Sequence, residues 1–185
     1  KKITPSEIIA SDKYAYSLAK KIFTKTKIKK AKNYYLAEGL SKLRKLKYKI
    51  NKNSILYLTE PIKPTKLKLK QSIGTINEFN LLKNFIKFIN NYEKVKLTIR
   101  LHPQEKINKY DNILKMLKID YAISKNNSLT KDLAKNKVII GADTYAMVFG
   151  LESKKQVFTS LPKGHNYTLP YKEIKRISEL EKILW

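Results

Sequence analysis

From residue 54 onward, short apolar runs alternate with segments that carry apolar residues at helical spacing. The runs are typical of buried strands and lie at residues 55–58, 96–101, 121–123, 137–141 and 156–158. Helices are expected between them, at residues 78–92, 109–118, 129–136 and 144–152, with a further helix at the C-terminal end. This alternation predicts an α/β fold in which crossover helices join five strands into a doubly wound parallel sheet.

The first fifty residues show a weaker form of the same alternation. In order, they predict a strand within residues 3–11, a helix from the N-cap Asp12 to Phe23, a strand within 27–33 and an amphipathic helix at 36–47. The polar segment 51–54 interrupts the pattern, so we place a domain boundary there, with residues 1–50 as the end of one domain and its linker helix, and residues 51–185 as a second domain. Residues 61–75 and 160–170 are expected to be loops.

The strand at 96–101 stops at His102, which Pro103 follows. Because proline lacks an N–H, the ladder of the sheet cannot continue, and His102 is placed at the carboxyl end of a strand. Ligands of open α/β sheets bind at that edge, so His102 is the first candidate for chemistry. Arg100 points to the opposite side from Leu101 and is expected to be structural.

A second stretch with a possible role follows about forty residues later. The β-branched run at 138–140 leads into a turn of small residues from Gly141 to Asp143, and Thr144 is expected to be the N-cap of an apolar helix. If the two strands are parallel neighbours, an imidazole, a hydroxyl and a helix N-terminus converge on one crevice. Such a crevice is suited to holding a phosphate.

The composition is that of a globular protein with an excess of lysine. The chain has 185 residues, of which 42% are hydrophobic, and a formal net charge of +25. Only Arg44, Arg100 and Arg176 are arginines, and the other 37 basic residues are lysines. Bidentate recognition of phosphates and bases favours arginine, and Lys, Asn and Ile share AT-rich codons, so we expect no specific nucleic-acid partner. An anionic membrane surface stays open as a partner.

Several classes of site are excluded by missing motifs. There is no cysteine and there are only two histidines, which gives no zinc signature, and His165 is expected to be a surface histidine. No Asp-x-Asp pair indicates a metal clamp on a diphosphate, and no dinucleotide, P-loop or serine-hydrolase motif occurs. We therefore expect neither metal nor cofactor. No signal peptide or apolar segment of twenty residues is visible, and a cytoplasmic location is expected.

Three segments together resemble a known enzyme family. They are Ile55-Leu-Tyr-Leu-Thr-Glu-Pro-Ile62, Arg100-Leu-His-Pro-Gln-Glu105 and Gly141-Ala-Asp-Thr-Tyr-Ala-Met-Val-Phe149. The set is similar to the donor-binding half of bacterial GT-B glycosyltransferases with a His-Pro motif, and especially to the sialyltransferases that act on lipooligosaccharide and capsule. The resemblance covers about residues 54–160 and implies a Rossmann-like C-terminal domain, preceded by a remnant of the amino-terminal domain.

The resemblance also implies roles for individual residues. In such enzymes the histidine contacts the phosphate of CMP and aids its departure, which falls here on His102, and a Ser/Thr that binds the same phosphate corresponds to Thr144. A departing phosphate gains negative charge, which a cationic imidazole and a helix N-terminus stabilise without metal. The matching segments supply the other candidates for nucleotide or phosphate binding: Pro103, Gly141, Asp143, Tyr145 and Glu60. The implied reaction is inverting transfer of sialic acid from a CMP-sugar to an oligosaccharide acceptor.

Two departures keep alternatives open. Thr144-Tyr145 stands where Ser-Ser or Ser-Thr is more usual, and Phe149 occupies what would be the ribose-binding Glu position of retaining GT-B enzymes. Teichoic-acid glycerophosphotransferases also fit the Asp143-Thr-Tyr turn followed by Phe149, and a non-catalytic nucleotide- or polyanion-binding module is a further alternative. The resemblance implies that the catalytic base lies in the amino-terminal domain, so we expect this chain to bind nucleotide without transferring sugar alone. We also expect a possible homo-oligomer and a peripheral position at the inner membrane.

Overall fold

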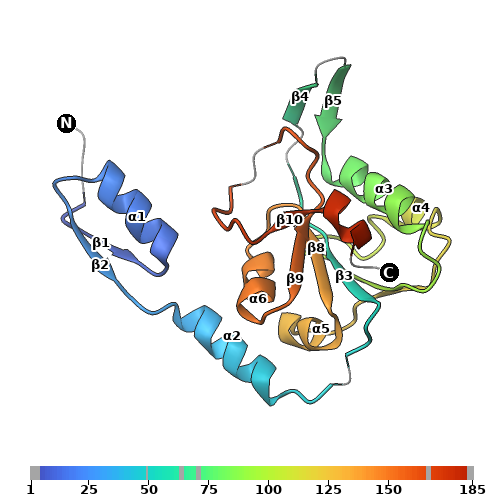
Figure 1. The fold of residues 1–185 in the computed structure, drawn as a ribbon, viewed down its shortest axis with the longest axis horizontal. Coiled ribbons are helices and arrows are strands. Elements are labelled where there is room, and N and C mark those ends of the chain that lie inside the picture. Colours follow the sequence, from blue (N-terminus) through green and yellow to red (C-terminus); the bar gives the residue numbers. More distant parts are fainter. Residues whose placement is uncertain (1–4, 49, 63–64, 70–71, 166–167, 183–185) are drawn as a thin grey trace.

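In the computed structural model, which describes residues 5–48, 50–62, 65–69, 72–165 and 168–182, one sheet organises the larger part of the chain (Figure 1). Its strands are β3 (Ser54–Leu58), β6 (Lys96–Arg100), β7 (Tyr121–Ile123), β8 (Val138–Gly141), β9 (Gln156–Thr159) and β10 (Lys175–Arg176). All neighbours are parallel, and the spatial order is β10-β9-β8-β3-β6-β7. The predicted α/β architecture with a parallel sheet is confirmed.

The order of the strands fixes the point at which the chain reverses direction across the sheet. The chain begins at β3, adds β6 and β7 on one side, and then crosses back to add β8, β9 and β10 on the other. Counted along the chain, this is the 3-2-1-4-5-6 order of doubly wound nucleotide-binding sheets. The reversal lies between β3 and β8, and the carboxyl edge at such a point is where ligands of these sheets bind.

Strand β3 lies inside the sheet, between β8 and β6, and every one of its residues is buried. Ile55 and Tyr57 pack into a core on one face of the sheet, whereas Leu56 and Leu58 pack into a second core on the other face. The first face is covered by α3 (Glu78–Ile89), α4 (Asp111–Leu114) and the 3₁₀ helix η1 (Ile177–Lys182), and the second by α2 (Tyr34–Lys45), α5 (Leu129–Lys135) and α6 (Ala146–Glu152). A strand whose residues are all buried requires helices on both faces of the sheet.

Two helices show how well helical spacing predicts structure here. The stripe from Leu82 to Ile89 in α3 is buried as expected, and Asn77 caps this helix by accepting from the Asn80 N–H at 2.9 Å. The helix expected at 109–118 is wrong, because only four residues of it are α-helical. The following residues tighten instead into turns, in which Met116 and Leu117 donate to carbonyls three residues earlier.

The loop expected at 61–75 is also wrong. Strands β4 (Thr65–Leu69) and β5 (Ser72–Ile76) form an antiparallel hairpin there, which projects from the sheet in Figure 1. Its root is held by Ile76, which packs against Leu81, Ala142 and Leu161. Residues 63–64 and 70–71 lie outside the described residues, as do 166–167 in the expected loop 160–170. The C-terminal helix is the short η1, and β10 before it was not predicted.

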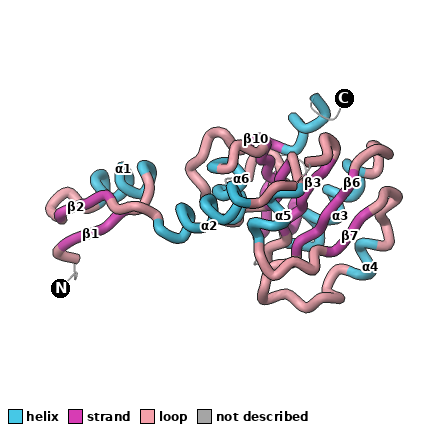
Figure 2. Tube along the Cα trace, turned by 90° about the horizontal axis from the view of Figure 1, so that it is seen from below, coloured by secondary structure: helices cyan, strands magenta, loops and turns pink. Residues whose placement is uncertain are grey.

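The N-terminal residues form a separate strand–helix–strand unit, as predicted. Strands β1 (Glu7–Ala10) and β2 (Lys27–Lys30) pair in parallel, and α1 (Lys13–Ile22) connects them. Asp12 is the N-cap of α1, and its Oδ1 accepts from the N–H groups of Tyr14 and Ala15 at 2.8 Å each. Figure 2 shows this unit beside the six-stranded sheet, with α2 running between the two. None of the described helices has the length and apolarity needed to cross a bilayer.

Helix α2 is attached to the six-stranded part by a close contact at Gly39. It packs against α5 and α6, and a Cβ built on Gly39 would lie 2.3 Å from Cε1 of Phe149. Tyr35 adds an edge-on ring contact with Phe149, at 5.4 Å between ring centres. Phe149, at the position compared above with a ribose-binding Glu, is therefore buried beneath α2 and is 3% exposed.

We expect Gly39→Ala to destabilise the protein although alanine favours helices. The substitution gains about 1 kcal/mol of helix propensity, but overpacking against Phe149 costs about 1–3 kcal/mol. Ser41→Ala, at an exposed position of the same helix, is the matched control and should be neutral or slightly stabilising. Urea unfolding followed by circular dichroism measures both, and a Gly39→Ala variant as stable as Ser41→Ala would contradict the contact.

Candidate functional site

The chemically interesting residues lie where β3, β6 and β8 end. Glu60 follows β3, His102 follows β6 and Asp143 follows β8. The strands that precede His102 and Thr144, β6 and β8, were expected to be neighbours, but they are not. Strand β3 lies between them and pairs with β6 on one side and with β8 on the other. Glu60 consequently lies between the two expected halves of the site.

His102 begins a tight turn rather than an irregular loop. The N–H of Glu105 donates to the His102 carbonyl at 2.9 Å, which places Pro103 at the second position of the turn, where its fixed φ is favourable. The Nδ1 of His102 accepts from the Gln104 N–H at 3.3 Å. When the imidazole is neutral, this bond leaves its proton on Nε2. The half-buried imidazole thus keeps one N–H for a ligand.

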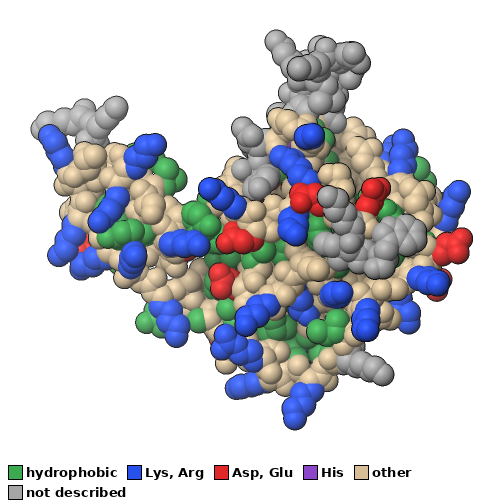
Figure 3. All heavy atoms as spheres, viewed as in Figure 1, with side chains coloured by type: hydrophobic (Ala, Val, Ile, Leu, Met, Phe, Trp, Pro, Cys, Tyr) green, Lys and Arg blue, Asp and Glu red, His purple; other side chains and the backbone are tan. Residues whose placement is uncertain are grey.

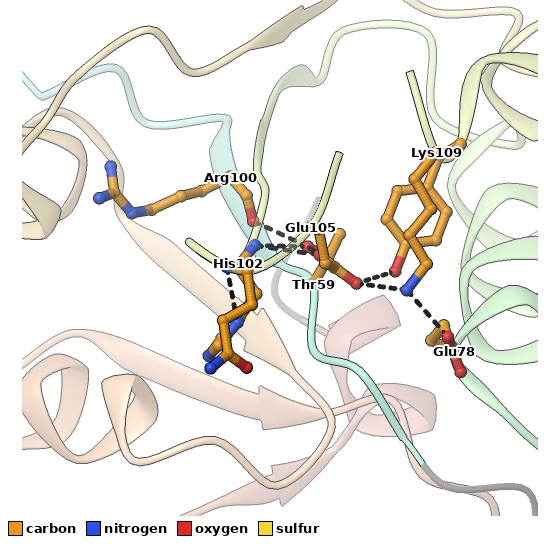
Figure 4. Close-up of polar contacts among 8 residues, drawn as sticks. Thr59, Glu78, Arg100, His102, Glu105 and Lys109 are labelled. Carbon is orange, nitrogen blue, oxygen red and sulfur yellow. Dashed lines mark hydrogen bonds and ion pairs between the residues drawn. The ribbon is translucent and has the colours of Figure 1, made fainter. Parts of the chain in front are cut away.

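The turn is anchored by the carboxylate of Glu105 (Figure 4). Its Oε2 accepts from the His102 N–H at 3.0 Å and from the Thr59 hydroxyl. Its Oε1 accepts from the Lys109 ammonium at 2.8 Å and from the Tyr110 hydroxyl. The Glu105 side chain is only 2% exposed, so these four donors satisfy a charge that has almost no contact with water.

Opposing influences act on the ionisation of Glu105. Burial is the largest of them and raises its pKa, but the hydrogen bonds from Lys109, Thr59 and Tyr110, together with that from the His102 N–H, outweigh it. The net pKa of Glu105 is lowered. Lys109 is shared with Glu78 at 2.8 Å, which ties the start of α3 to the same network.

Glu60 is in the opposite electrostatic situation. Burial raises its pKa, and the carboxylates of Asp143 and Glu105 raise it further. The Asp143 N–H, which donates to Glu60 Oε2 at 3.0 Å, and His102 act in the other direction without cancelling the increase. A carboxyl group with a raised pKa beside an imidazole, at a sheet edge, is a combination found at functional sites.

Asp143 holds a loop in place. Its two carboxylate oxygens accept from the N–H groups of Thr168 at 2.6 Å and Leu169 at 3.1 Å. This carboxylate was expected to contact nucleotide, but both of its oxygens are engaged with the backbone that follows β9.

Gly141 and Thr144 shape the turn between them. A Cβ on Gly141 would lie 3.0 Å from Sδ of Met147 and 3.2 Å from Cγ2 of Thr144, so a larger residue here would have to displace these side chains. Thr144 is not the helix N-cap, because α6 begins at Ala146 and Tyr145 precedes it. The Thr144 hydroxyl accepts from the Ala146 N–H at 3.5 Å, which is the limit of a hydrogen bond and leaves it available.

Tyr145 is directed toward the N-terminal part of the chain. Its hydroxyl accepts from Nδ2 of Asn33, the N-cap of α2, at 2.7 Å, and its ring lies edge-on to Phe149. Burial raises the pKa of this hydroxyl, and the bond from Asn33 lowers it. The contact joins α2 to α6, and the ring keeps 38% of its surface exposed.

Both arginines that flank the site have structural partners. Arg100 forms an ion pair with the buried Asp132 at 2.5 Å, which confirms its expected structural role. Arg176 donates to the carbonyls of Leu161, Pro162 and His165 and so fixes the loop after β9. Among the described residues, no three His, Cys, Asp or Glu side chains are grouped as a metal site would require.

Sequence reasoning missed the residues that build the site from below. Thr59, Glu105, Lys109 and Tyr110 were not selected, although Glu105 follows His102 by only three positions. A glutamate in a polar segment is expected to be exposed to solvent, because the neighbouring sequence does not show that Tyr110 will bury it. A usable signal was the threonine directly after a strand with no polar interior position.

We expect Glu105→Gln to reduce stability at neutral pH by about 3 kcal/mol, because it removes the charge from a buried, paired site. Because the pKa of Glu105 is lower in the folded protein than its ordinary value of 4.5, its ionisation stabilises the fold fully at pH values above 4.5. This stabilisation is lost as the pH falls through the pKa of the folded state. The difference between wild type and variant should therefore be full at pH 7 and shrink below pH 4.5 in urea titrations. Glu93→Gln, at an exposed position, is the control, and a gap independent of pH would exclude this role for Glu105.

Comparisons with known proteins give no relative for this chain: no family model, no curated protein and no solved structure matches it. The resemblance drawn from the three segments therefore stays a prediction.

Proposed function

We propose that this chain is the donor-binding part of a metal-independent, inverting glycosyltransferase that takes sialic acid from a CMP-sugar to a surface polysaccharide or lipooligosaccharide. The observation that supports it most is the position of His102, Glu60 and the 141–144 turn around the reversal point of a 3-2-1-4-5-6 sheet. That edge is the usual nucleotide site of such sheets. The choice of CMP and of the acceptor comes from the resemblance alone.

His102 would act on the phosphate that leaves with CMP. Its Nε2–H is unoccupied among the described contacts, while Nδ1 is held by the Gln104 N–H. As the bond to the sugar breaks, the phosphate oxygen gains negative charge, and a hydrogen bond to it becomes stronger. The Thr144 hydroxyl, engaged only at 3.5 Å, is a second donor for the same phosphate.

The carboxylates at this edge do not rule out an anionic ligand. Glu105 is compensated by Lys109 and three further donors, and Asp143 accepts from two backbone N–H groups. Glu60 has a raised pKa, which favours its protonated form. Glu60 therefore loses its negative charge at a higher pH than an ordinary glutamate does, and it can donate a hydrogen bond to a phosphate or sugar oxygen only once it is protonated.

The same proposal places the protein in the cytoplasm, at the inner face of the membrane where the acceptor is built. Figure 3 shows lysine and arginine side chains at many separate places on the face in view, most of them near its outline. Such a distribution favours a general attraction to anionic lipid over a defined nucleic-acid groove.

We expect His102→Ala to weaken CMP binding about tenfold, which corresponds to one hydrogen bond to a charged group of about 1.4 kcal/mol. His165→Ala, which removes the other histidine, should bind as wild type does. Isothermal titration calorimetry with CMP, UDP and CDP measures both variants, and CMP should bind most tightly. A duplex DNA control with a salt titration is included. Equal affinities in the two variants, or steep salt dependence without nucleotide preference, would favour a polyanion-binding module instead.

We further expect CMP affinity to be unchanged by metal. The expectation follows from the absence of an Asp-x-Asp pair in the sequence and from the hydrogen bonds that His102 and the Thr144 hydroxyl can donate to the phosphate. Calorimetric titrations in EDTA and in millimolar magnesium or manganese should give the same dissociation constant. Binding that appears only with the metals would overturn the metal-independent mechanism.

A further inference from the structure

A cavity of about 490 Å³ lies at some distance from the His102 edge. It is bordered by the start of α1, the turn between α6 and β9, and β10, and it collects Lys13, Lys155 and Lys175 from these three segments. Its wall at β9 is three strands away from β6 in the sheet. Figure 3 shows the surface indented between the N-terminal unit and the rest of the molecule. The volume is within the range of small-molecule sites.

Lys155 is a partly buried cation without a counter-charge. Burial lowers its pKa, and no other influence on it is resolved. Among the described residues, no carboxylate lies within 4.0 Å of its ammonium group. A cation that is partly removed from water without a partner is unfavourable, and an anion bound in the cavity would compensate it.

Gln156, the next residue, also lines the cavity and has an unmet requirement. Its Oε1 is buried and has no hydrogen-bond partner among the described residues. An unpaired buried acceptor is rare in folded proteins. Because the protein covers this atom almost completely, a ligand in the cavity would reach it only after the Gln156 side chain turned.

Two glutamates, Glu152 and Glu173, share the wall with the lysines and with Lys154. Four cations thus face two anions, so the cavity retains a net positive charge while offering carboxylate oxygens as acceptors. A ligand that satisfies this set carries one anionic group and several hydroxyl groups.

Lys154 adds an observation about the backbone. Its φ is +59°, and it stands at the position after the C-cap of α6 where a glycine is usual. The Lys154 N–H donates to the Leu151 carbonyl and the Lys155 N–H to the Gly150 carbonyl, both at 2.9 Å, which is the Schellman arrangement. At this positive φ a lysine is less stable than a glycine would be. Replacing Lys154 with glycine therefore removes the charge of the side chain and favours the fold at the same time.

We propose that this cavity binds a phosphorylated sugar, with the phosphate between Lys13, Lys155 and Lys175 and sugar hydroxyls on Glu152 and Glu173. The site does not depend on the function proposed for the His102 edge. Because Lys13 belongs to the N-terminal unit and the other lysines to the six-stranded part, the ligand bridges the two.

The test is calorimetric titration with glucose 6-phosphate, inorganic phosphate and glucose at one ionic strength. We expect glucose 6-phosphate to bind more tightly than phosphate, and glucose not to bind. Lys155→Met should weaken glucose 6-phosphate binding about tenfold. Lys131→Met, an exposed lysine of α5 with the same change of charge, should leave it unchanged.

Lys154→Gly separates charge from folding. It should raise the urea midpoint, because glycine adopts the positive φ without strain, and weaken glucose 6-phosphate binding less than Lys155→Met does, because Lys154 is not one of the three lysines around the phosphate. If Lys155→Met lowers stability, Lys175→Met at the exposed rim takes its place. Equal losses in Lys155→Met, Lys175→Met and Lys131→Met would reveal non-specific attraction and overturn the proposal, as would equal binding of glucose and its phosphate.

Discussion

The geometry of the candidate site depends on the buried carboxylate of Glu105. Burying an unpaired carboxylate costs several kcal/mol, so the fold must bring donors to it from every side. Thr59 follows β3, the His102 N–H follows β6, and Lys109 and Tyr110 directly precede α4. Because these segments share one acceptor, none of them can shift without leaving it unsatisfied. The turn at His102 is therefore tied to the residues that follow β3 and to those that precede α4.

The residues at the carboxyl edge divide into two groups. Gly141, Asp143 and Tyr145 are committed to the protein itself: a close turn, a tethered loop and a contact with α2. His102 and Thr144 retain hydrogen-bonding capacity toward a ligand, since one ring N–H and a loosely engaged hydroxyl are left over. The sequence alone offered no reason to rank these candidates, but the contacts that each side chain makes in the folded protein distinguish structural residues from potential ligand-binding ones.

The parts of the fold that were predictable are those in which local pattern and tertiary role agree. Val138 to Ile140 is apolar because both sides of β8 are buried, and the stripe in α3 is apolar because one side is. The β4–β5 hairpin was missed because its lysine-rich sequence resembles a solvated loop. Its two strands pair only with each other and not with the six-stranded sheet. Glu105 was missed for a related reason: whether a glutamate is buried depends on residues that reach it only after folding.

The small N-terminal sheet should open locally more easily than the rest of the fold. Only two strands and one helix make up this unit, and Ile9, Leu18 and Ile22 remain 57–64% exposed. Little apolar area holds β1 to β2, whereas β3 is enclosed by two cores. Local opening there should therefore need far less free energy than global unfolding, and its amide protons should exchange with solvent long before those of β3 and β8. The chain then consists of two cooperative units of unequal stability, joined by α2.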